Sequence, residues 1–214
     1  MSRGAFITLE GIEGAGKSTV ALWLCTWLRS RGLSVRQTRE PGGTELAERV
    51  RRIVLERGSE RVSAEAETLL MFAARAIHLD NLVRPALAAG EWVVSDRFTD
   101  ATRAYQGGGR GVDVTWIDAL AARVHGDLTP MCTLLLDLPV RLGLSRARAR
   151  RGEEDRFEAE TEAFFERVRA EYLALARREP QRIRLIDASA PVAAVQEQVA
   201  AALHPWLTCA GARS

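Results

Sequence analysis

The sequence predicts an α/β protein in which one parallel sheet of five strands is covered by helices on both faces. Two observations lead to this fold class. Short apolar segments alternate along the 214 residues with longer segments of helical periodicity, as expected where helices join parallel strands. The segment 11–18 has the pattern G-x-x-x-x-G-K-S between the first expected strand and the first expected helix. Together they predict a single domain of residues 1–207, with a tail at 208–214.

The segment 11–18 is predicted to bind the phosphates of ATP in a P-loop NTPase fold. Apolar residues 5–9 precede it as a strand, and residues 19–31 follow as an amphipathic helix. Glycines let successive N–H groups face one concavity, and the helix start adds a positive dipole end. Lys17 is expected to reach the outer phosphates and Ser18 to hold Mg²⁺, whereas the alternative is a turn that binds nothing. The expected ATP contacts are Gly11, Ile12, Glu13, Gly14, Ala15, Gly16, Lys17, Ser18 and Thr19.

The next expected elements are a strand, a helix and a longer helix, at 34–39, 45–57 and 64–88. Thr44 could cap the first of these helices, and Pro85 lies near the end of the second. A third strand is expected at 91–95, and it is largely apolar, as a buried parallel strand should be. Asp96 and Arg97 follow at its carboxyl end, where α/β sheets bind ligands. They are therefore candidate site residues, with a surface ion pair as the alternative.

A polar segment with three consecutive glycines, residues 98–110, follows this third strand. Helical patterns then alternate with two further apolar segments that we interpret as strands. The helix that starts at Pro139 runs into the highest density of charge in the chain, residues 146–156, which by itself is most simply a solvated face. The expected strands are 131–138 and 182–187, and the expected helices are 113–125, 139 onward, 161–178 and 191–206.

Composition restricts the functional classes that fit the chain. A net charge of +2 argues against bulk binding of nucleic acid or a membrane surface. The sequence has no apolar run long enough for a membrane span and no leader-like start, so we expect a cytoplasmic protein. Three cysteines at unrelated spacings indicate neither a disulfide framework nor a metal site.

Several motifs, taken together, resemble those of bacterial thymidylate kinases. They occur in that family's order at 8–11, 39–44, 96–98 and 104–110, with further similarity at 150–158, 164–167 and 186–189. The resemblance covers nearly the whole chain. It implies transfer of the γ-phosphoryl group of ATP to dTMP, giving dTDP and ADP for dTTP synthesis, with Mg²⁺ as cofactor. It also implies a homodimer, for which the apolar helix face at 69–82 is a candidate surface.

The resemblance assigns catalytic roles to Lys17 and Arg97, and it places Mg²⁺ on Ser18 and Asp96. Family members carry a transition-state arginine either in the phosphate loop or in a lid. Glu13 and Ala15 leave this loop without an arginine, so the chain resembles the lid type, with a lid at about 146–158. Its candidate catalytic arginines are Arg150 and Arg156, ranked ahead of Arg148 and Arg151.

The family's dTMP-binding positions match ten residues spread over the chain. Phe72 and Arg75 match an aromatic ring and an arginine placed against thymine, although Phe72 is equally well explained as core and Met71 could share its role. Thr102 and Gln106 match positions that hydrogen-bond the base. The full set is Glu13, Glu40, Pro41, Arg51, Phe72, Arg75, Arg97, Thr102, Tyr105 and Gln106.

Two other functions remain open at this point. A kinase of the same architecture could act on another monophosphate such as dUMP, dCMP or dGMP. A P-loop ATPase could instead bind DNA or a partner, although the near-zero net charge and the lack of a basic strip interleaved with aromatic residues argue against it. Ala101 and Arg103 depart from the common family pattern, so base contacts in that segment are less clearly implied.

Overall fold

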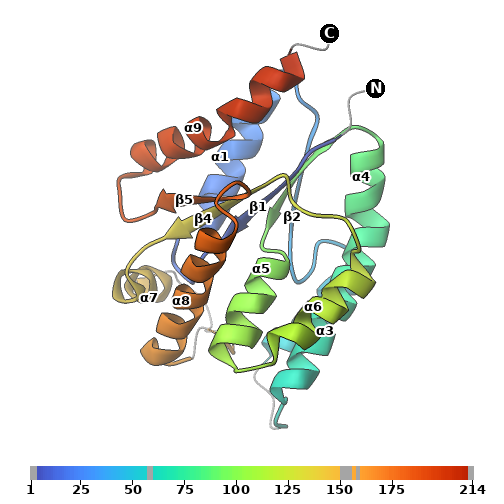
Figure 1. The fold of residues 1–214 in the computed structure, drawn as a ribbon, viewed down its shortest axis with the longest axis vertical. Coiled ribbons are helices and arrows are strands. Elements are labelled where there is room, and N and C mark those ends of the chain that lie inside the picture. The colour runs from blue at the N-terminus through green and yellow to red at the C-terminus, as the bar shows by residue number, and fades with distance from the viewer. Residues whose placement is uncertain (1–3, 57–59, 150–155, 158–159, 212–214) are drawn as a thin grey trace.

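The computed structural model describes residues 4–56, 60–149, 156–157 and 160–211, without the side chains of 208–211. A five-stranded sheet crosses this part of the chain, with strand order β2-β3-β1-β4-β5 and every neighbouring pair parallel (Figure 1). The predicted sheet is therefore confirmed. The strands are Phe6–Glu10 (β1), Val35–Arg39 (β2), Trp92–Asp96 (β3), Cys132–Asp137 (β4) and Ile183–Asp187 (β5).

Helices cover both faces of the sheet (Figure 1). On one face α1 (Lys17–Arg29) and α9 (Val192–Gly211) pack together; on the other, α4 (Arg84–Ala88) packs on β3 and α8 (Glu162–Arg178) on β4 and β5. The three-layer prediction is thus confirmed. The remaining elements are α2 (Glu45–Leu55), α3 (Ala64–His78), α5 (Thr99–Thr102), α6 (Val114–Val124), α7 (Val140–Ala149) and the π-helical segments η1 (Leu79–Val83) and η2 (Arg103–Gly109). None of the helices in the described ranges has the length and apolar character needed to cross a membrane.

The burial of the strands explains their positions in the sheet. The central strand β1 is buried throughout, as an apolar strand covered on both faces should be, whereas the edge strands β2 and β5 expose part of their side chains. Leu9 of β1 pairs with Asp96 of β3, so the carboxyl ends of both strands lie together. The chain places β2 and β3 on one side of β1 and then crosses to β4 and β5 on the other. Ligands bind at the carboxyl edge of a sheet where the strand order changes direction in this way.

The helix expected at 64–88 contains a π-helical turn. The N–H of Arg84 donates to the carbonyl of Leu79, five residues earlier, at the last turn before Pro85. Proline has no N–H and its ring crowds the carbonyl four residues back, so the wider turn fits it into the helical path. Residues 64–88 therefore form α3, η1 and α4 in direct succession.

Two smaller expectations about helix ends differ from the structure. Thr44 precedes α2, but its side chain makes no capping bond, and the N–H of Gly43 donates instead to Oε1 of Glu48 at 2.9 Å. The last helix continues to Gly211, beyond the expected end at 206, and contains Pro205. Local sequence patterns therefore predicted both helices, but not the hydrogen bond at the start of α2 or the full length of α9.

Residues 99–109 of the polar segment 98–110 are helical, as α5 and η2. The glycine run allows it to approach α8, because a Cβ at Gly109 would lie 2.5 Å from Cε2 of Phe164. A Cβ at Gly108 would lie 2.8 Å from Cβ of Glu171. Glycine at these positions therefore allows the helices to pack closely, although a run of glycines in a sequence usually indicates a loop.

Candidate active site

The phosphate loop joins β1 to α1 at the carboxyl edge of the sheet. Gly14 has a φ of 73°, and a Cβ there would collide with the carbonyl oxygen of Gly143 on α7, so only glycine fits. Gly16 precedes α1 without a side-chain cap, and the first turn of α1 carries no acidic side chain. The helix start is thus available to an anion.

Lys17 folds back over this loop. Its Nζ donates to the carbonyl of Ile12 at 2.9 Å and to that of Gly11 at 3.1 Å, and the residue is 7 % exposed. Burial lowers the pKa of Lys17 below its ordinary value, and the neighbouring Arg97 lowers it further. Two carbonyl oxygens therefore hold the ammonium group beside the positions where phosphates would sit.

Ser18 and Asp96 lie together although they are 78 positions apart in the sequence. The hydroxyl of Ser18 donates to Oδ2 of Asp96 at 3.4 Å, across from the end of β3. Hydroxyl and carboxylate oxygens are ligands that Mg²⁺ prefers, and this ion usually takes only one or two protein ligands besides phosphates and water. Within the described ranges, no group of three or more His, Cys, Asp or Glu side chains could hold a metal. The pair therefore fits Mg²⁺ bound together with a nucleotide.

Arg97 forms hydrogen bonds with four groups around the phosphate loop. Its Nη2 donates to Oε1 of Glu13 at 2.6 Å and to the hydroxyl of Tyr105 at 2.9 Å, and its Nη1 donates to the carbonyl of Gly11 and the hydroxyl of Tyr172, each at 3.1 Å. Arg97 also has a φ of 75°, in the left-handed region that favours glycine. Such a conformation persists only where the surroundings enforce it, which is common at functional sites.

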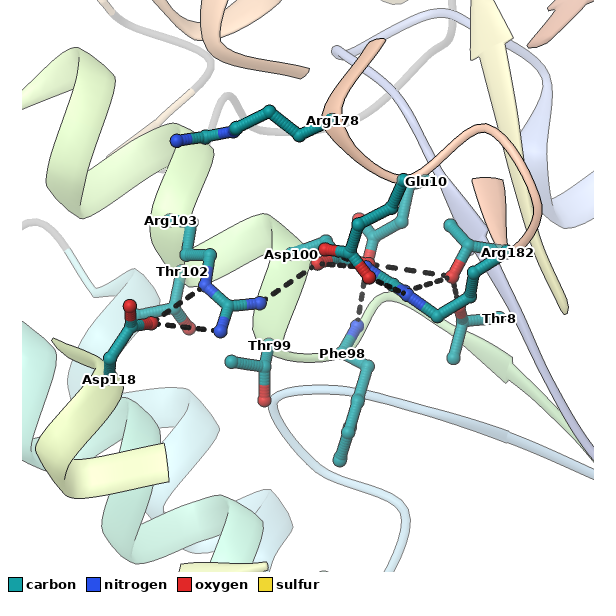
Figure 2. Close-up of polar contacts among 12 residues, drawn as sticks. Thr8, Glu10, Phe98, Thr99, Asp100, Thr102, Arg103, Asp118, Arg178 and Arg182 are labelled. Carbon is teal, nitrogen blue, oxygen red and sulfur yellow. Dashed lines mark hydrogen bonds and ion pairs between the residues drawn. The ribbon is translucent and has the colours of Figure 1, made fainter. Parts of the chain in front are cut away.

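Two buried acidic side chains, Glu10 and Asp100, hold the segment that begins at Phe98 (Figure 2). Oε1 of Glu10 accepts the N–H of Phe98 at 2.7 Å. Asp100 accepts from Nη1 of Arg182 at 2.6 Å and from Nη1 of Arg103 at 3.2 Å. These contacts tie α5 to the central strand and to the start of β5, and so fix the backbone that carries Arg97.

Glu10 is fully buried, and burial raises its pKa to about 8. This value includes the effect of the nearby Asp100, which also raises the pKa, and the effects of Arg97, the hydroxyl of Tyr172 and the N–H of Phe98, which lower it. The hydroxyl of Tyr172 donates to Oε2 of Glu10 at 2.7 Å and accepts from Nη1 of Arg97. Glu10 therefore helps to position Arg97 through this tyrosine.

A second group of polar side chains lies where α3 faces α5 and η2. Nε of Arg75 donates to Oε2 of Glu40 at 2.7 Å, and Nη2 donates to the hydroxyl of Thr102 at 3.1 Å. Nη1 of Arg75 is buried without a hydrogen-bond partner among the residues that the structure describes. Nε2 of Gln106 donates to Oε1 of Glu67 at 2.7 Å. One donor of Arg75 is therefore left for a ligand.

One cavity of about 410 Å³ joins the phosphate loop to this second group. Most of the sequence-predicted site residues line it together: Glu13, Gly14, Gly16, Lys17, Ser18, Thr19, Glu40, Pro41, Arg51, Arg75, Asp96, Arg97, Thr102, Tyr105 and Gln106. The remaining loop residues Gly11, Ile12 and Ala15 lie in the same turn beneath it. Nη1 of Arg51 donates to the carbonyl of Pro41 at 2.9 Å, which holds this side of the cavity in place.

Outside the phosphate loop, two described residues of the predicted set, Phe72 and Arg156, are not among those that line the cavity. Phe72 is buried in a core cluster with Val112 and Ile117, whereas its neighbour Met71 lines the cavity. Arg156 pairs through Nη2 with Oε2 of Glu67 at 2.7 Å, away from the phosphate loop. Arg150 lies outside the described residues, as does Arg151.

Several residues of the site were not singled out from the sequence. Glu10 and Tyr172 support Arg97, Glu67 holds Gln106, and Arg146 lines the cavity while donating to the carbonyl of Ala188 at 2.8 Å. One signal was present for Glu67, which precedes Met71 by four residues and Arg75 by eight and therefore shares their helix face. Arg103, in contrast, pairs with Asp100 and Asp118 and does not line the cavity.

Comparisons with known proteins agree with this arrangement. The family model described as thymidylate kinase matches residues 9–199. The thymidylate kinase of Pseudomonas putida strain W619 is 59 % identical over 198 residues, which cover 92 % of this chain and 95 % of that protein. That of Pseudomonas syringae pv. syringae strain B728a is 60 % identical over 193 residues, covering 90 % and 91 %.

A solved structure is similar as well. The crystal structure of thymidylate kinase from Ehrlichia chaffeensis matches with a TM-score of 0.76 and 31 % sequence identity, covering 94 % of this chain and 99 % of that one. Sequence, fold and the cavity at the end of β1 and β3 thus point to the same conclusion. The chain belongs to the thymidylate kinase family.

Proposed function

We propose that the protein transfers the γ-phosphoryl group of ATP to dTMP and releases dTDP and ADP. The observation that carries this proposal is the single cavity lined both by the phosphate loop and by Arg75, Thr102 and Gln106. A donor and an acceptor nucleotide can therefore meet in one cavity. An oxygen of the dTMP phosphate attacks the γ-phosphorus, and the bond from that phosphorus to the bridging oxygen of ADP breaks.

The chain's own residues supply positive charge and position for this reaction. Phosphoryl transfer needs in-line placement of two anions and stabilisation of the charge on the transferring group. The ammonium group of Lys17 and the N–H groups at the start of α1 bind the donor phosphates. Arg97 lies between this loop and Tyr105, where its planar guanidinium can bind a phosphate of each nucleotide.

Mg²⁺ is the proposed cofactor, with Ser18 and Asp96 as its protein ligands. When bound, this ion neutralises charge on the outer phosphates of ATP. The two side chains fix where the ion binds relative to Lys17, since both lie at the junction of β3 and α1.

The acceptor side of the cavity supports a deoxyribonucleotide with a thymine base. The unpaired Nη1 of Arg75 can donate to a carbonyl oxygen of the base. Tyr105 is held edge-on by Phe157, Phe164 and Phe165, and its hydroxyl donates to Oε1 of Glu13 at 3.2 Å. This fixed ring beside Glu13 favours a sugar without a 2′-hydroxyl, with the 3′-hydroxyl near the carboxylate.

The lid arginine remains part of the proposal. We propose that Arg150 or Arg156 approaches the transferring phosphoryl group when both nucleotides are bound. Arg156 would have to leave Glu67 to do so. A structure with dTMP and a non-hydrolysable ATP analogue tests this directly, since it identifies which arginine contacts the γ-phosphate.

The oligomeric state and location are also proposals. Three large apolar side chains, Leu46, Ile53 and Leu69, are about half exposed on the adjacent helices α2 and α3. We infer a homodimer formed through this face, and a cytoplasmic location. Light scattering with size-exclusion chromatography measures the mass, and a monomer at micromolar concentration contradicts the dimer.

A coupled assay of ADP release tests the activity. With ATP and Mg²⁺, we expect turnover on dTMP far above that on dCMP, dGMP or AMP. Turnover that prefers one of those other monophosphates would instead support the alternative kinase. ATP hydrolysis that requires DNA and not dTMP contradicts both kinase functions.

A further inference from the structure

Glu67 is a buried carboxylate that contacts polar groups from two parts of the chain, the segment of η2 with Arg110 and residue Arg156. It is 1 % exposed on α3. Its Oε1 accepts from Nε2 of Gln106 at 2.7 Å and from Nε of Arg110 at 3.2 Å, and its Oε2 lies 2.7 Å from Nη2 of Arg156. It does not line the cavity itself, whereas Gln106 does.

Two guanidinium groups, those of Arg110 and Arg156, lie beside the carboxyl group of Glu67 and form ion pairs with it. An ionised carboxylate accepts hydrogen bonds and cannot donate them. The atom of Gln106 that lies 2.7 Å from it must therefore be the amide nitrogen, because an amide oxygen at that distance would be repelled. Glu67 thus fixes which way the amide of Gln106 faces.

This orientation leaves Oε1 of Gln106 for a ligand. Among the described residues, no donor to that oxygen is found. Arg75 lines the same cavity, and its Nη1 is a buried donor that has no hydrogen-bond partner in the described part of the chain. The base site therefore offers one acceptor and one donor. Thymine and uracil present the complementary pair, N3–H and the C4 carbonyl, whereas cytosine presents a bare N3 and a C4 amino group.

We propose that Glu67 is a positioning residue for base selection, which excludes cytosine by holding the carbonyl oxygen of Gln106 toward N3 of the base. The proposal rests on the proposed function and extends it. A free amide could rotate to offer its NH₂ group to cytosine N3 at little cost. With Glu67 in place, that rotation sets the amide oxygen against a carboxylate and leaves a buried group unsatisfied.

The test is the substitution Glu67→Gln, with dUMP and dCMP as competing substrates because they differ only at N3 and C4. A neutral amide at 67 can donate or accept, so the amide of Gln106 becomes free to rotate. We expect the ratio of kcat/KM for dUMP to that for dCMP to fall about tenfold, the size expected for one mismatched hydrogen bond. Part of the selectivity should remain, because Arg75 still faces C4. For dTMP, KM should rise while kcat changes little.

Two further variants distinguish a positioning role of Glu67 from a general loss of structure. Glu160→Gln removes the other carboxylate bound to Arg110, without touching Gln106, and should leave the ratio unchanged. Gln106→Met removes the amide itself and should lower the ratio by a similar factor. In that background, adding Glu67→Gln should change the ratio no further.

Each outcome is decisive. If Glu67→Gln folds and keeps the wild-type ratio, or still lowers it when residue 106 is Met, the inference is overturned while the kinase function stands. If Glu67→Gln does not fold by circular dichroism, Gln106→Met alone decides, and an unchanged ratio overturns the inference. If the wild-type protein phosphorylates neither dTMP nor dUMP, the proposed function fails and the inference fails with it.

Discussion

Nε of Arg75 lies 2.7 Å from Oε2 of Glu40, and each side chain is only 3 % exposed. The other oxygen of Glu40 accepts from Nδ1 of His78 at 3.0 Å. Burial alone would raise the pKa of Glu40, but Arg75 and His78 together hold it below its ordinary value. The orientation of Arg75 in the cavity therefore depends on a carboxylate from the segment after β2.

Removal of that carboxylate should destabilise the fold strongly. We expect Glu40→Ala to lower the free energy of unfolding by about 3–5 kcal/mol, because Arg75 would remain buried without a counter-charge. Urea denaturation measures it. Glu91→Ala is the control, since its partner Arg36 is about half exposed, and that change should cost less than about 1 kcal/mol. Equal effects of the two substitutions would contradict the importance of the buried pair.

Glu10 should make stability depend on pH in an unusual direction. Its pKa is raised from 4.5 to about 8 in the folded state, so between these values the folded protein holds a proton that the unfolded chain releases. Stability from this group is complete below about pH 4.5 and is lost as the pH rises through 8, with a slope of up to about 1.4 kcal/mol per pH unit.

Comparison with Glu10→Gln isolates this effect. The free energy of unfolding of the wild-type protein minus that of Glu10→Gln should fall between pH 5 and pH 8. Urea titrations at three pH values measure the difference. A difference that is independent of pH shows that Glu10 is ionised throughout this range in the folded protein.

Lys17 should be needed for catalysis but not for folding. Its Nζ contacts only two loop carbonyls among the described residues, so Lys17→Ala should keep the native circular dichroism spectrum. Without the ammonium group, the negative charge on the phosphates is no longer stabilised by this residue, so kcat should fall by roughly 10²–10³. Steady-state kinetics with ATP and dTMP measures kcat, and unchanged turnover in the folded variant would refute the assignment.

Arg97 should not be replaceable by lysine. Its two terminal nitrogens contact four different acceptors, which a single ammonium group cannot reach together. We expect Arg97→Lys to lower kcat/KM for dTMP by at least about a hundredfold. Arg36→Lys, in a surface ion pair, serves as the matched control and should retain full activity.

The glycine run in η2 provides a test of packing. Gly109→Ala should lower the free energy of unfolding by about 1–3 kcal/mol, because the new methyl group would lie 2.5 Å from the ring of Phe164. Gly107→Ala is the control: its nearest neighbours would be 3.4 Å away, at ordinary contact distance. Thermal denaturation of both variants measures the contrast. If Gly107→Ala is as harmful as Gly109→Ala, close packing on α8 is not the reason for the glycines.

Much of the fold could be predicted because its signals are local. Each predicted strand was found to within about a residue, since an apolar segment between polar turns marks a buried strand wherever it lies. The π-helical turn at Leu79–Val83 could not be predicted, because it depends on how Pro85 is accommodated within a longer helix. The helical conformation of 98–110 was missed for a similar reason, since contact with α8 outweighs the low helix preference of glycine.

The sequence alone determined the phosphate loop, the strands and the residues that match the family, because these are set by residue types at fixed spacing. Tertiary structure decided which of those residues share a cavity: Phe72 lies in the core while Met71 lines the cavity, and Arg156 pairs with Glu67. It also revealed Glu10 and Glu67 as supports for Arg97 and Gln106. Such partners are far apart in the chain, and only the packing of α3 and β1 against the segment that carries Arg97 and Gln106 brings their charges together.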